Sequence, residues 1–583
     1  MNAEGRTTAA VVIALAMSLT AGAAGAPQAA LAASAAPVGG ADGMVASGHR
    51  LASEVGADIL RQGGNAVDAA VAVGYALAVV FPAAGNIGGG GFMTIQFADG
   101  RKTFVDFREK APLAATEKMY QDAEGNVVPG LSTRGYLAVG VPGSVAGFEA
   151  VRERYGTMPR DRLIAPAVAL AGQGFVLEPG DVDSIGNAAK DLAQDPAAAA
   201  IFLKPGGQLY KAGERLVQKD LAGSLSLIAR DGADAFYKGS IGEAIVKASR
   251  ESKGILDMAD FERYKIRELK PVECDYRGYH IASAPPPSSG GVVICEILNI
   301  LEGYKMGELG FHSADSVHYM IEAMRHAYVD RNSYLGDPDF VKNPVDRLLE
   351  KGYAEKIRAV IDPEKAGDSK ALRPGVPPHE GTQTTHYSIV DKNGNAVAVT
   401  YTLNDWFGAR VVAPGTGILL NDEMDDFTAK PGVPNLYGLV QGEANAISPG
   451  KTPLSSMSPT IVSKDGKPVM VIGSPGGSRI ITITLEAIMN AVDYGMDVQE
   501  AIDAPRIHHQ WLPETVSLER FALSPDTRRM LEAMGYRFTD DKPWGHADGI
   551  LIGAPTLGGK ARGDARFYGA NDPRLDLGAA VGY

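Results

Sequence analysis

Cysteine is scarce in this sequence, which contains only Cys274 and Cys295 among its 583 residues. A fold held together by a framework of disulfides is therefore excluded, although an exported chain permits a single bridge. Cys274 lies in a polar, strand-like stretch, and Cys295 lies in an apolar, helix-like run from 292 to 301. This setting favours a buried free thiol at Cys295, and the redox state of the pair stays open.

Positive charge is also in short supply. Lys and Arg number 56 against 69 for Asp and Glu, which leaves a formal net charge of −13. This balance argues against nucleic acid or an anionic membrane as a partner, because both attract basic proteins. The apolar content of 45% and the charged content of 21% are ordinary for a globular protein.

Apolar runs long enough to cross a bilayer are missing as well. The run 67–81 falls short of the roughly 20 residues that a membrane helix needs. Residues 1–32 instead have the features of a secretory signal, with an apolar core at 9–19 and small residues at 24–26 and 30–32 that suit cleavage. We therefore expect an exported protein, either periplasmic or secreted. A retained membrane anchor is the alternative, and the short apolar core argues against it.

The patterns that hold metals and cofactors are absent. The pair His508-His509 is not part of an HExxH zinc site, and the carboxylates of 419–427 lack the spacing of a calcium loop. Gly88–Gly91 follows a helix and precedes a strand, whereas a dinucleotide fingerprint needs the reverse order. Gly473–Arg479 has the right order but lacks the lysine of a phosphate loop, so its N–H groups are better suited to stabilising an oxyanion. We expect neither a metal nor a cofactor.

The stretch 383–404 predicts two strands joined by a tight turn. Asn393-Gly394 is a strong hairpin signal, because such a turn needs a positive φ that glycine adopts freely. Apolar residues occupy alternate positions of the second run, 397–401, as in a half-buried strand. The hairpin would return both strand ends to one edge, where a threonine hydroxyl could act as a nucleophile if a base stood beside it.

Helices and another strand are expected before this hairpin. Ser47 can cap a helix whose apolar positions recur every four residues, and Asn65 can cap the next one. The second helix is apolar on nearly every side, which predicts a central buried helix. Residues 103–109 predict a strand with Arg108 near its end. An arginine beside an apolar strand can hold a carboxylate bidentately.

Six motifs follow one another along the chain: Gly88–Gly91, Asp106–Arg108, Pro285–Gly291, the stretch 383–404, Leu454–Pro459 and Gly473–Arg479. In kind and order they resemble the motifs of the γ-glutamyltransferases (γ-glutamyltranspeptidases), a family of N-terminal nucleophile hydrolases. The resemblance covers residues 44 to 583 and implies an α+β fold, a four-layer αββα sandwich. It also implies a precursor that cuts itself between Gln383 and Thr384. The products would be a large chain, 33–383, and a small chain, 384–583, which form a heterodimer.

The resemblance further implies a role for each site residue. Thr384 would be the nucleophile, and after the cut its own α-amine, with an unperturbed pKa of roughly 7.7–8.0, would be the general base. Thr402 would orient the Thr384 hydroxyl, and N–H groups of Gly476 and Gly477 would face the oxyanion. The other residues would bind a γ-glutamyl donor such as glutathione: Arg108, Ser455 and Ser456 its α-carboxylate, Asn404, Glu423 and Asp426 its α-ammonium, and Tyr437 as a lid. The γ-glutamyl ester on Thr384 would pass its acyl group to water, an amino acid or a peptide.

Other functions are compatible with parts of this pattern. A cephalosporin (glutaryl) acylase of the same fold would keep the nucleophile, but it would leave the Asp426 carboxylate facing an acyl group that has no ammonium. A relative that anchors poly-γ-glutamate would need an open groove, against which the loop 431–442 argues. An exported binding protein without turnover would stay uncut. Asp405, Trp406 and Arg410 depart from the family pattern near the acceptor side, so the balance between hydrolysis and transfer is open.

Overall fold

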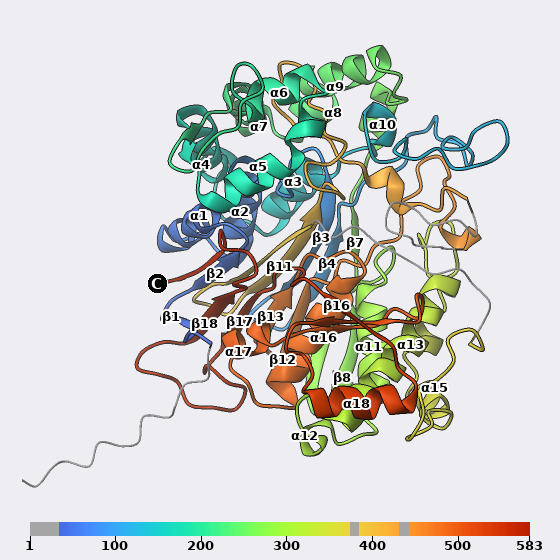
Figure 1. Cartoon of the computed structure of the whole chain (residues 1–583). Helices are drawn as coiled ribbons and strands as arrows, with labels where there is room; N and C mark the ends of the chain where they lie inside the picture. The colour runs from blue at the N-terminus through green and yellow to red at the C-terminus, as the bar shows by residue number, and fades with distance from the viewer. Residues whose placement is uncertain (1–33, 373–383, 431–441) are drawn as a thin grey trace, which may run out of the picture.

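Two seven-stranded antiparallel sheets form the centre of the molecule (Figure 1). The computed structural model describes residues 34–372, 384–430 and 442–583. The sheet that carries the predicted hairpin, here the hairpin sheet, has the order β19 (Ala579–Gly582), β2 (Met44–Ser47), β10 (Thr385–Val390), β11 (Ala396–Thr402), β3 (Gly90–Gln96), β4 (Lys102–Asp106), β7 (Arg267–Leu269). The second sheet has the order β1 (Val38–Gly40), β18 (Phe567–Asn571), β17 (Asp548–Ile552), β13 (Lys467–Gly473), β12 (Thr460–Lys464), β9 (Tyr279–Ser283), β8 (Val272–Tyr276).

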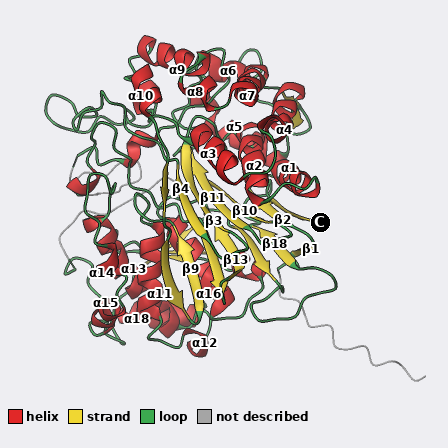
Figure 2. Ribbon diagram, turned by 180° about the vertical axis from the view of Figure 1, so that it is seen from behind, coloured by secondary structure: helices red, strands yellow, loops and turns green. Residues whose placement is uncertain are grey.

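The two sheets face each other, and helices cover their outer faces (Figure 2). The hairpin sheet packs against α1 (Arg50–Arg61), α2 (Ala66–Val80) and α3 (Ser144–Tyr155), and α4 (Arg160–Gln173) packs on α2. The second sheet packs against α11 (Gly290–Leu301), α16 (Arg479–Val492) and α17 (Val498–Asp503), and α13 (Ala314–Tyr334) packs on α11. Between the sheets lies a core in which alanines of the hairpin sheet, including Ala46, Ala396 and Ala398, pack with larger residues of the second sheet such as Ile461 and Ile550. The predicted α+β fold, a four-layer αββα sandwich, is confirmed.

Further elements surround these four layers. Beyond α1 to α4 the chain adds α5 (Pro179–Leu192), α6 (Pro196–Phe202), α7 (Lys219–Asp231), α8 (Ala233–Tyr237), α9 (Ser240–Glu251), α10 (Met258–Arg263) and the strand pair β5 (Phe175–Val176) and β6 (Arg215–Leu216). The remaining helices are α12 (Met306–Leu309), α14 (Val345–Leu348), α15 (Lys351–Arg358) and α18 (Pro525–Met534), and a small sheet contains β14 (Ile507–His508), β15 (Val516–Glu519) and β16 (Phe538–Asp541).

The predicted hairpin is confirmed as β10 and β11. The strands pair in register from Thr385 opposite Tyr401 to Val390 opposite Ala396. Gly394 adopts φ +92° in the connecting turn, as its position in the sequence predicted. Apolar residues of β11 alternate between the two cores: Val397, Val399 and Tyr401 pack toward the helices, and Ala396 and Ala398 pack toward the second sheet. Both faces of the hairpin are therefore buried, so the expectation of a half-buried strand is wrong: the side of β11 that carries the small alanines is covered by the second sheet.

The central helix α2 is also confirmed. It is buried along its whole length, and Asn65 caps it through a capping box with Asp68. The predicted cap of the preceding helix is wrong, because Ser47 is still paired within the sheet as the last residue of β2. The helix α1 starts three residues later, where His49 Nδ1 accepts the N–H of Leu51 at 3.2 Å. In the described part of the chain, no helix combines the length and apolarity needed to cross a bilayer.

The cysteines correct another expectation. Cys274 on β8 and Cys295 on α11 form a disulfide across a sequence separation of 21 residues, so the predicted free thiol at Cys295 is wrong. The helix α11 follows the β8–β9 hairpin and packs back onto β8, which brings the two side chains together. That return is a tertiary contact, and the local patterns around each cysteine carry no sign of it.

The last strand, β19, closes the edge of the hairpin sheet. It pairs with β2, which in turn pairs with β10. The carbonyl oxygen of Tyr583 accepts the N–H groups of Ala41 and Asp42, each at 2.7 Å. The C-terminal residue thus lies against the segment between β1 and β2, as Figure 1 shows.

Candidate active site

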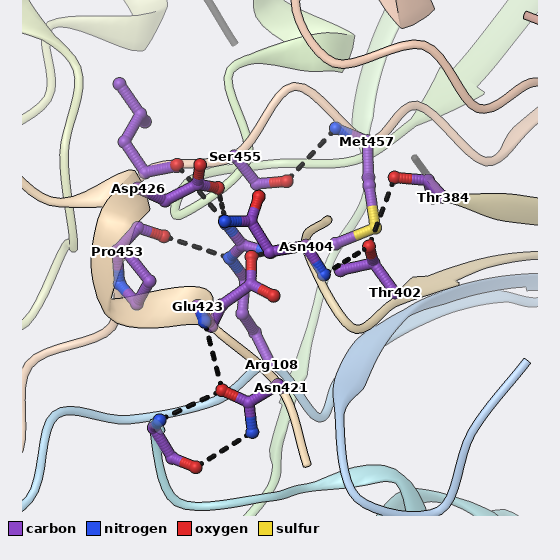
Figure 3. Close-up of polar contacts among 12 residues, drawn as sticks. Arg108, Thr384, Thr402, Asn404, Asn421, Glu423, Asp426, Pro453, Ser455 and Met457 are labelled. Atoms are coloured by element: carbon purple, nitrogen blue, oxygen red, sulfur yellow. Dashed lines mark hydrogen bonds and ion pairs between the residues drawn. The ribbon is translucent and has the colours of Figure 1, made fainter. Parts of the chain in front are cut away.

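The ends of the hairpin place two threonine hydroxyls side by side (Figure 3). Thr384 immediately precedes β10, and Thr402 is the last residue of β11. The Thr384 hydroxyl donates to Thr402 Oγ1 at 3.2 Å, and the N–H of Asn404 donates to the same oxygen at 2.8 Å. Both threonines are buried. The geometry fixes the direction in which the Thr384 oxygen points.

A neutral histidine lies one step further along the same face of the hairpin. His386 Nδ1 is 2.8 Å from Thr400 Oγ1, and its Nε2 is 3.1 Å from Ser388 Oγ. Burial lowers the pKa of His386 to about 3, so it is uncharged at neutral pH. Among the described residues no imidazole contacts the Thr384 hydroxyl, whose hydrogen-bond partner is Thr402. The described histidines therefore offer no contact to this hydroxyl.

Arg108, which lies just beyond β4, contacts both the carboxylates Glu423 and Asp426 and the backbone at Pro453. Its Nη1 lies 2.6 Å from Glu423 Oε1, and its Nη2 hydrogen bonds Asp426 Oδ2. Its Nε donates to the carbonyl of Pro453 at 3.1 Å. The two carboxylates raise the pKa of Arg108, which stays charged although it is 1% exposed. Arginine is suited to such a fork because its donors lie in one plane.

The carboxylates belong to the short 3-10 turn η2 (Glu423–Asp426). Sequence analysis assigned Arg108 to the donor's carboxylate and Glu423 and Asp426 to its ammonium, and in this structure Arg108 pairs with both of these carboxylates. Asn404 adopts a left-handed φ of 78°, and its amide donates to the carbonyl of Asp422 at 3.0 Å. The predicted residues are thus brought together around one guanidinium.

Ser455 and Ser456 present hydroxyl groups to the same part of the molecule as Arg108. Ser455 Oγ accepts the N–H of Met457 at 3.1 Å, and Ser456 Oγ accepts Nη2 of Arg331 at 2.9 Å. A hydroxyl that accepts a hydrogen bond keeps its own hydrogen for donation, so both serines can donate to an anion. Arg331, on α13, was missed by sequence analysis. It lies in a long helix with no motif around it, and only the fold brings it to Ser456.

The glycine loop after β13 forms another wall. Gly476 and Gly477 have φ of 139° and 59°, a region that glycine adopts without strain. The following residue, Ser478, is held from two sides: its hydroxyl donates to Gln510 at 2.6 Å, and its carbonyl accepts the hydroxyl of Tyr328 at 2.6 Å. Gly477 lines the cavity together with Thr384, and Gly476 immediately precedes Gly477 in the loop without lining the cavity itself.

These groups enclose one small cavity. It has a volume of about 20 Å³ and is lined by Arg108, Thr384, Thr402, Asn404, Glu423, Asp426, Ser455, Ser456, Met457, Gly477 and Ile480. This is room for about one water molecule. The predicted lid residue Tyr437 and the predicted cleavage residue Gln383 lie outside the described residues. In the described ranges, no group of His, Cys, Asp and Glu is arranged to hold a metal ion.

Comparison with known proteins gives this cavity a context. The family model named gamma-glutamyltranspeptidase matches residues 52–582, which is nearly the whole described chain. The chain belongs to the gamma-glutamyltranspeptidase family. Among the family's relatives, the glutathione hydrolase proenzyme of Pseudomonas sp. (strain A14) is 67% identical, with 95% of this chain and 96% of the relative covered. That of Escherichia coli (strain K12) is 51% identical, with 94% and 93% covered.

The gamma-glutamyltranspeptidase fold extends to a solved structure with a different name. The crystal structure of cephalosporin acylase from Bacillus halodurans matches with a TM-score of 0.82 at 27% identity, covering 96% of this chain and 99% of that one. Fold alone therefore does not separate the two activities, and the side chains of the cavity must do so.

Proposed function

We propose that this protein is an autoprocessed γ-glutamyltransferase that cleaves the γ-glutamyl amide bond of glutathione and related compounds. The observation that carries the proposal is the buried Thr384 hydroxyl at the predicted chain junction, hydrogen-bonded to Thr402 and facing the same cavity as Arg108 and Asp426. The names of the relatives, glutathione hydrolase proenzymes, support both the substrate and the precursor. No cofactor enters the reaction.

Processing and turnover use the same oxygen. In the precursor, the Thr384 hydroxyl attacks the carbonyl of Gln383, and the resulting ester is hydrolysed. The cut frees the α-amine of Thr384, whose unperturbed pKa of roughly 7.7–8.0 suits a general base near neutral pH. The neutral His386 is no competitor for this role, because its pKa is lowered to about 3. The oxyanion is stabilised by N–H groups of Gly476 and Gly477.

The protein recognises the donor by its α-carboxylate and its α-ammonium. Arg108, Ser455 and Ser456 bind its α-carboxylate, which is supported by serine hydroxyls free to donate. Asn404, Glu423 and Asp426 bind its α-ammonium, and Tyr437 acts as a lid. When the donor enters, the Arg108 guanidinium exchanges part of its contact with the protein carboxylates for the donor carboxylate. The γ-glutamyl ester on Thr384 then passes to water, or to an amino acid or peptide.

The mature enzyme is proposed to be a heterodimer of a large chain, 33–383, and a small chain, 384–583, cut from one precursor. Its two chains share the hairpin sheet, because β2, β3, β4 and β7 come from the first and β10, β11 and β19 from the second. Residues 1–32 act as a signal peptide for export to the periplasm or beyond. A membrane or nucleic-acid partner is not part of the proposal.

A cephalosporin (glutaryl) acylase is the alternative, since a structure with that name shares the fold. A glutaryl group has no α-ammonium, and the buried Glu423 and Asp426 would then lack a cation from the substrate. The higher identity to the glutathione hydrolases also favours the γ-glutamyl donor.

The test replaces the proposed nucleophile. Thr384→Ala should remain a single uncut chain without activity on γ-glutamyl-p-nitroanilide, whereas the wild type should yield a fragment with Thr384 at its N-terminus. The matched control is Thr385→Ala: that buried side chain lies next in sequence, but outside the cavity, and its variant should still be cut. A fragment beginning at residue 384 in purified Thr384→Ala protein would refute self-cleavage by this hydroxyl.

A further inference from the structure

Three carboxyl groups surround the guanidinium of Arg108. Glu423 and Asp426 contact it from η2, and Glu109 follows it directly in the chain. All are buried: Arg108 and Glu423 are 1% exposed, Glu109 is 0% and Asp426 is 7%. One positive charge thus faces three groups that are ordinarily negative at neutral pH. Burying a charge without a counter-charge costs free energy, so one guanidinium cannot compensate three ionised carboxylates.

Of these three carboxyl groups, Glu109 has the fewest contacts that could stabilise a negative charge. Neither of its carboxyl oxygens has a hydrogen-bond donor among the described residues. Its Oε2 is pressed against Gly90 of β3, where an added Cβ would lie 2.6 Å from that oxygen. The nearby hydroxyls of Tyr237 and Tyr264 donate elsewhere, to the carbonyls of Pro142 and Arg108. With 0% of its side chain exposed, Glu109 has no contact with bulk solvent.

The other charged groups of the turn face away from Glu109. Asp422 accepts the N–H of Asp405 at 2.9 Å, and Asp425 accepts the hydroxyl of Ser132. The groups that act on both Glu109 and Glu423 are therefore Arg108, Asp426 and each other. Burial raises the pKa of Glu109 to about 8 and that of Glu423 to about 8, with Arg108 opposing the shift in both. The two carboxyl groups behave as one buried pair.

We propose that Glu109 and Glu423 share one proton in the empty site, and that the donor's α-ammonium displaces this proton when it binds. Glu109 is then a residue that helps to select ammonium-bearing acyl groups, although it stands behind the residues that touch the donor. The inference rests on the proposed function, because it takes Glu423 and Asp426 as the ligands of that ammonium.

The exchange balances in charge and in atoms. In the empty site the carboxyl O–H of the pair holds the proton, and Arg108 compensates Asp426 and part of the remaining charge. When the donor enters, the carboxyl O–H breaks, the proton passes to solvent, and the ammonium keeps its three hydrogens. An acyl group without an ammonium cannot replace the positive charge of the proton. It therefore binds either beside the protonated carboxyl pair or beside a buried negative charge that nothing compensates.

The test compares two competitive inhibitors that differ only in the α-ammonium, L-glutamate and glutarate. Their inhibition constants are measured against hydrolysis of γ-glutamyl-p-nitroanilide by the processed wild type at pH 6.0, 7.0 and 7.5. The ratio of the two constants cancels any titration that affects both ligands alike, including that of the Thr384 amine. For displacement of one proton from a group with a pKa of about 8, the preference for L-glutamate should rise about ninefold between pH 6 and pH 7.

Two variants locate the effect. Glu423→Gln keeps the size and loses the titrating group, so its ratio should change less than about twofold over the same range. Asp425→Asn makes the same kind of change on the same turn, but away from Arg108, and should keep the wild-type slope. A ratio independent of pH in the wild type would overturn the proton exchange, and so would loss of the slope in Asp425→Asn. No hydrolysis of the anilide by the wild type would instead overturn the proposed function.

Discussion

Arg331 offers a sharp test of how the donor's α-carboxylate is bound. This residue is 0% exposed, and its guanidinium donates to Ser456 Oγ through Nη2 and to Ser289 Oγ through Nε, both at 2.9 Å. Because Ser456 Oγ accepts a hydrogen bond from Arg331, the Ser456 hydroxyl hydrogen remains available to donate. Ser456 lines the cavity, so this hydrogen can be donated to an anion bound there. Arg331→Lys keeps the positive charge but loses the planar fork that reaches both serines.

The expected loss can be worked out from that hydrogen bond. A hydrogen bond to a charged group contributes about 1.5–3 kcal/mol, which corresponds to about 10- to 150-fold in kcat/KM. The loss should appear mainly in KM, because the carboxylate is held in the ground state as well as in the transition state. The assay is the hydrolysis of γ-glutamyl-p-nitroanilide beside that of 4-aminobutyryl-p-nitroanilide, which lacks the α-carboxylate. The second substrate should change less than about threefold, since it makes no contact with Ser456.

The matched control is another buried arginine of the same helix. Arg325 forms ion pairs with Glu322 and Glu514 rather than contacts with Ser455 or Ser456. Arg325→Lys should therefore lower stability without altering the ratio of kcat/KM for the two substrates. If Arg331→Lys reduced hydrolysis of both anilides by the same factor, Arg331 would have no role in reading the carboxylate, and the reasoning would be refuted.

Three further outcomes are expected. Thr402→Ala should process and turn over slowly, with a loss on the order of 10²–10³-fold that Thr402→Ser restores, and a wild-type turnover number in the alanine variant would contradict this. Asp426→Asn should process normally but lose roughly 30- to several-thousand-fold in kcat/KM on the γ-glutamyl anilide, as expected for 2–5 kcal/mol from a buried charge pair; the matching glutaryl anilide should gain relative to it, and an unchanged ratio would exclude Asp426 from ammonium binding. Replacing Cys274 and Cys295 by serine should lower the midpoint of urea unfolding, since closing a loop of 21 residues is worth about 3 kcal/mol. Reduced wild type should match the variant, and a variant as stable as the oxidised wild type would show that the bridge contributes nothing.

Much of the fold near the hairpin could be predicted from local patterns. The turn at Gly394, the alternation along 397–401 and the cap at Asn65 depend on neighbouring residues, and each is present as expected. Ser47 shows the limit of the method. Its hydroxyl makes it a good cap, but pairing with Tyr387 and Ala579 keeps its backbone extended. A tertiary constraint overrode a local preference there.

The site was predictable only where a motif marks it. The predicted residues within the described ranges gather around one cavity, apart from Gly476, but their mutual contacts could not be foreseen. The pairing of Arg108 with both carboxylates and the support of Ser456 by Arg331 join elements far apart in the chain, and the Cys274–Cys295 bridge joins a strand to a helix that packs back onto it. Such contacts depend on how layers pack, and single-sequence periodicity carries no information about that.

The position of the C-terminus suggests a way to rebuild the gene. Tyr583 lies against Ala41 and Asp42, so a short linker could connect the last strand to the first without crossing the molecule. A circular permutant joined in this way could begin at Thr384 and end near residue 372, the last described residue before the junction. After removal of the initiator methionine, its nucleophile would be the first residue, with a free amine that needs no self-cleavage. Catalysis could then be studied in variants that cannot cut themselves, which separates maturation from turnover.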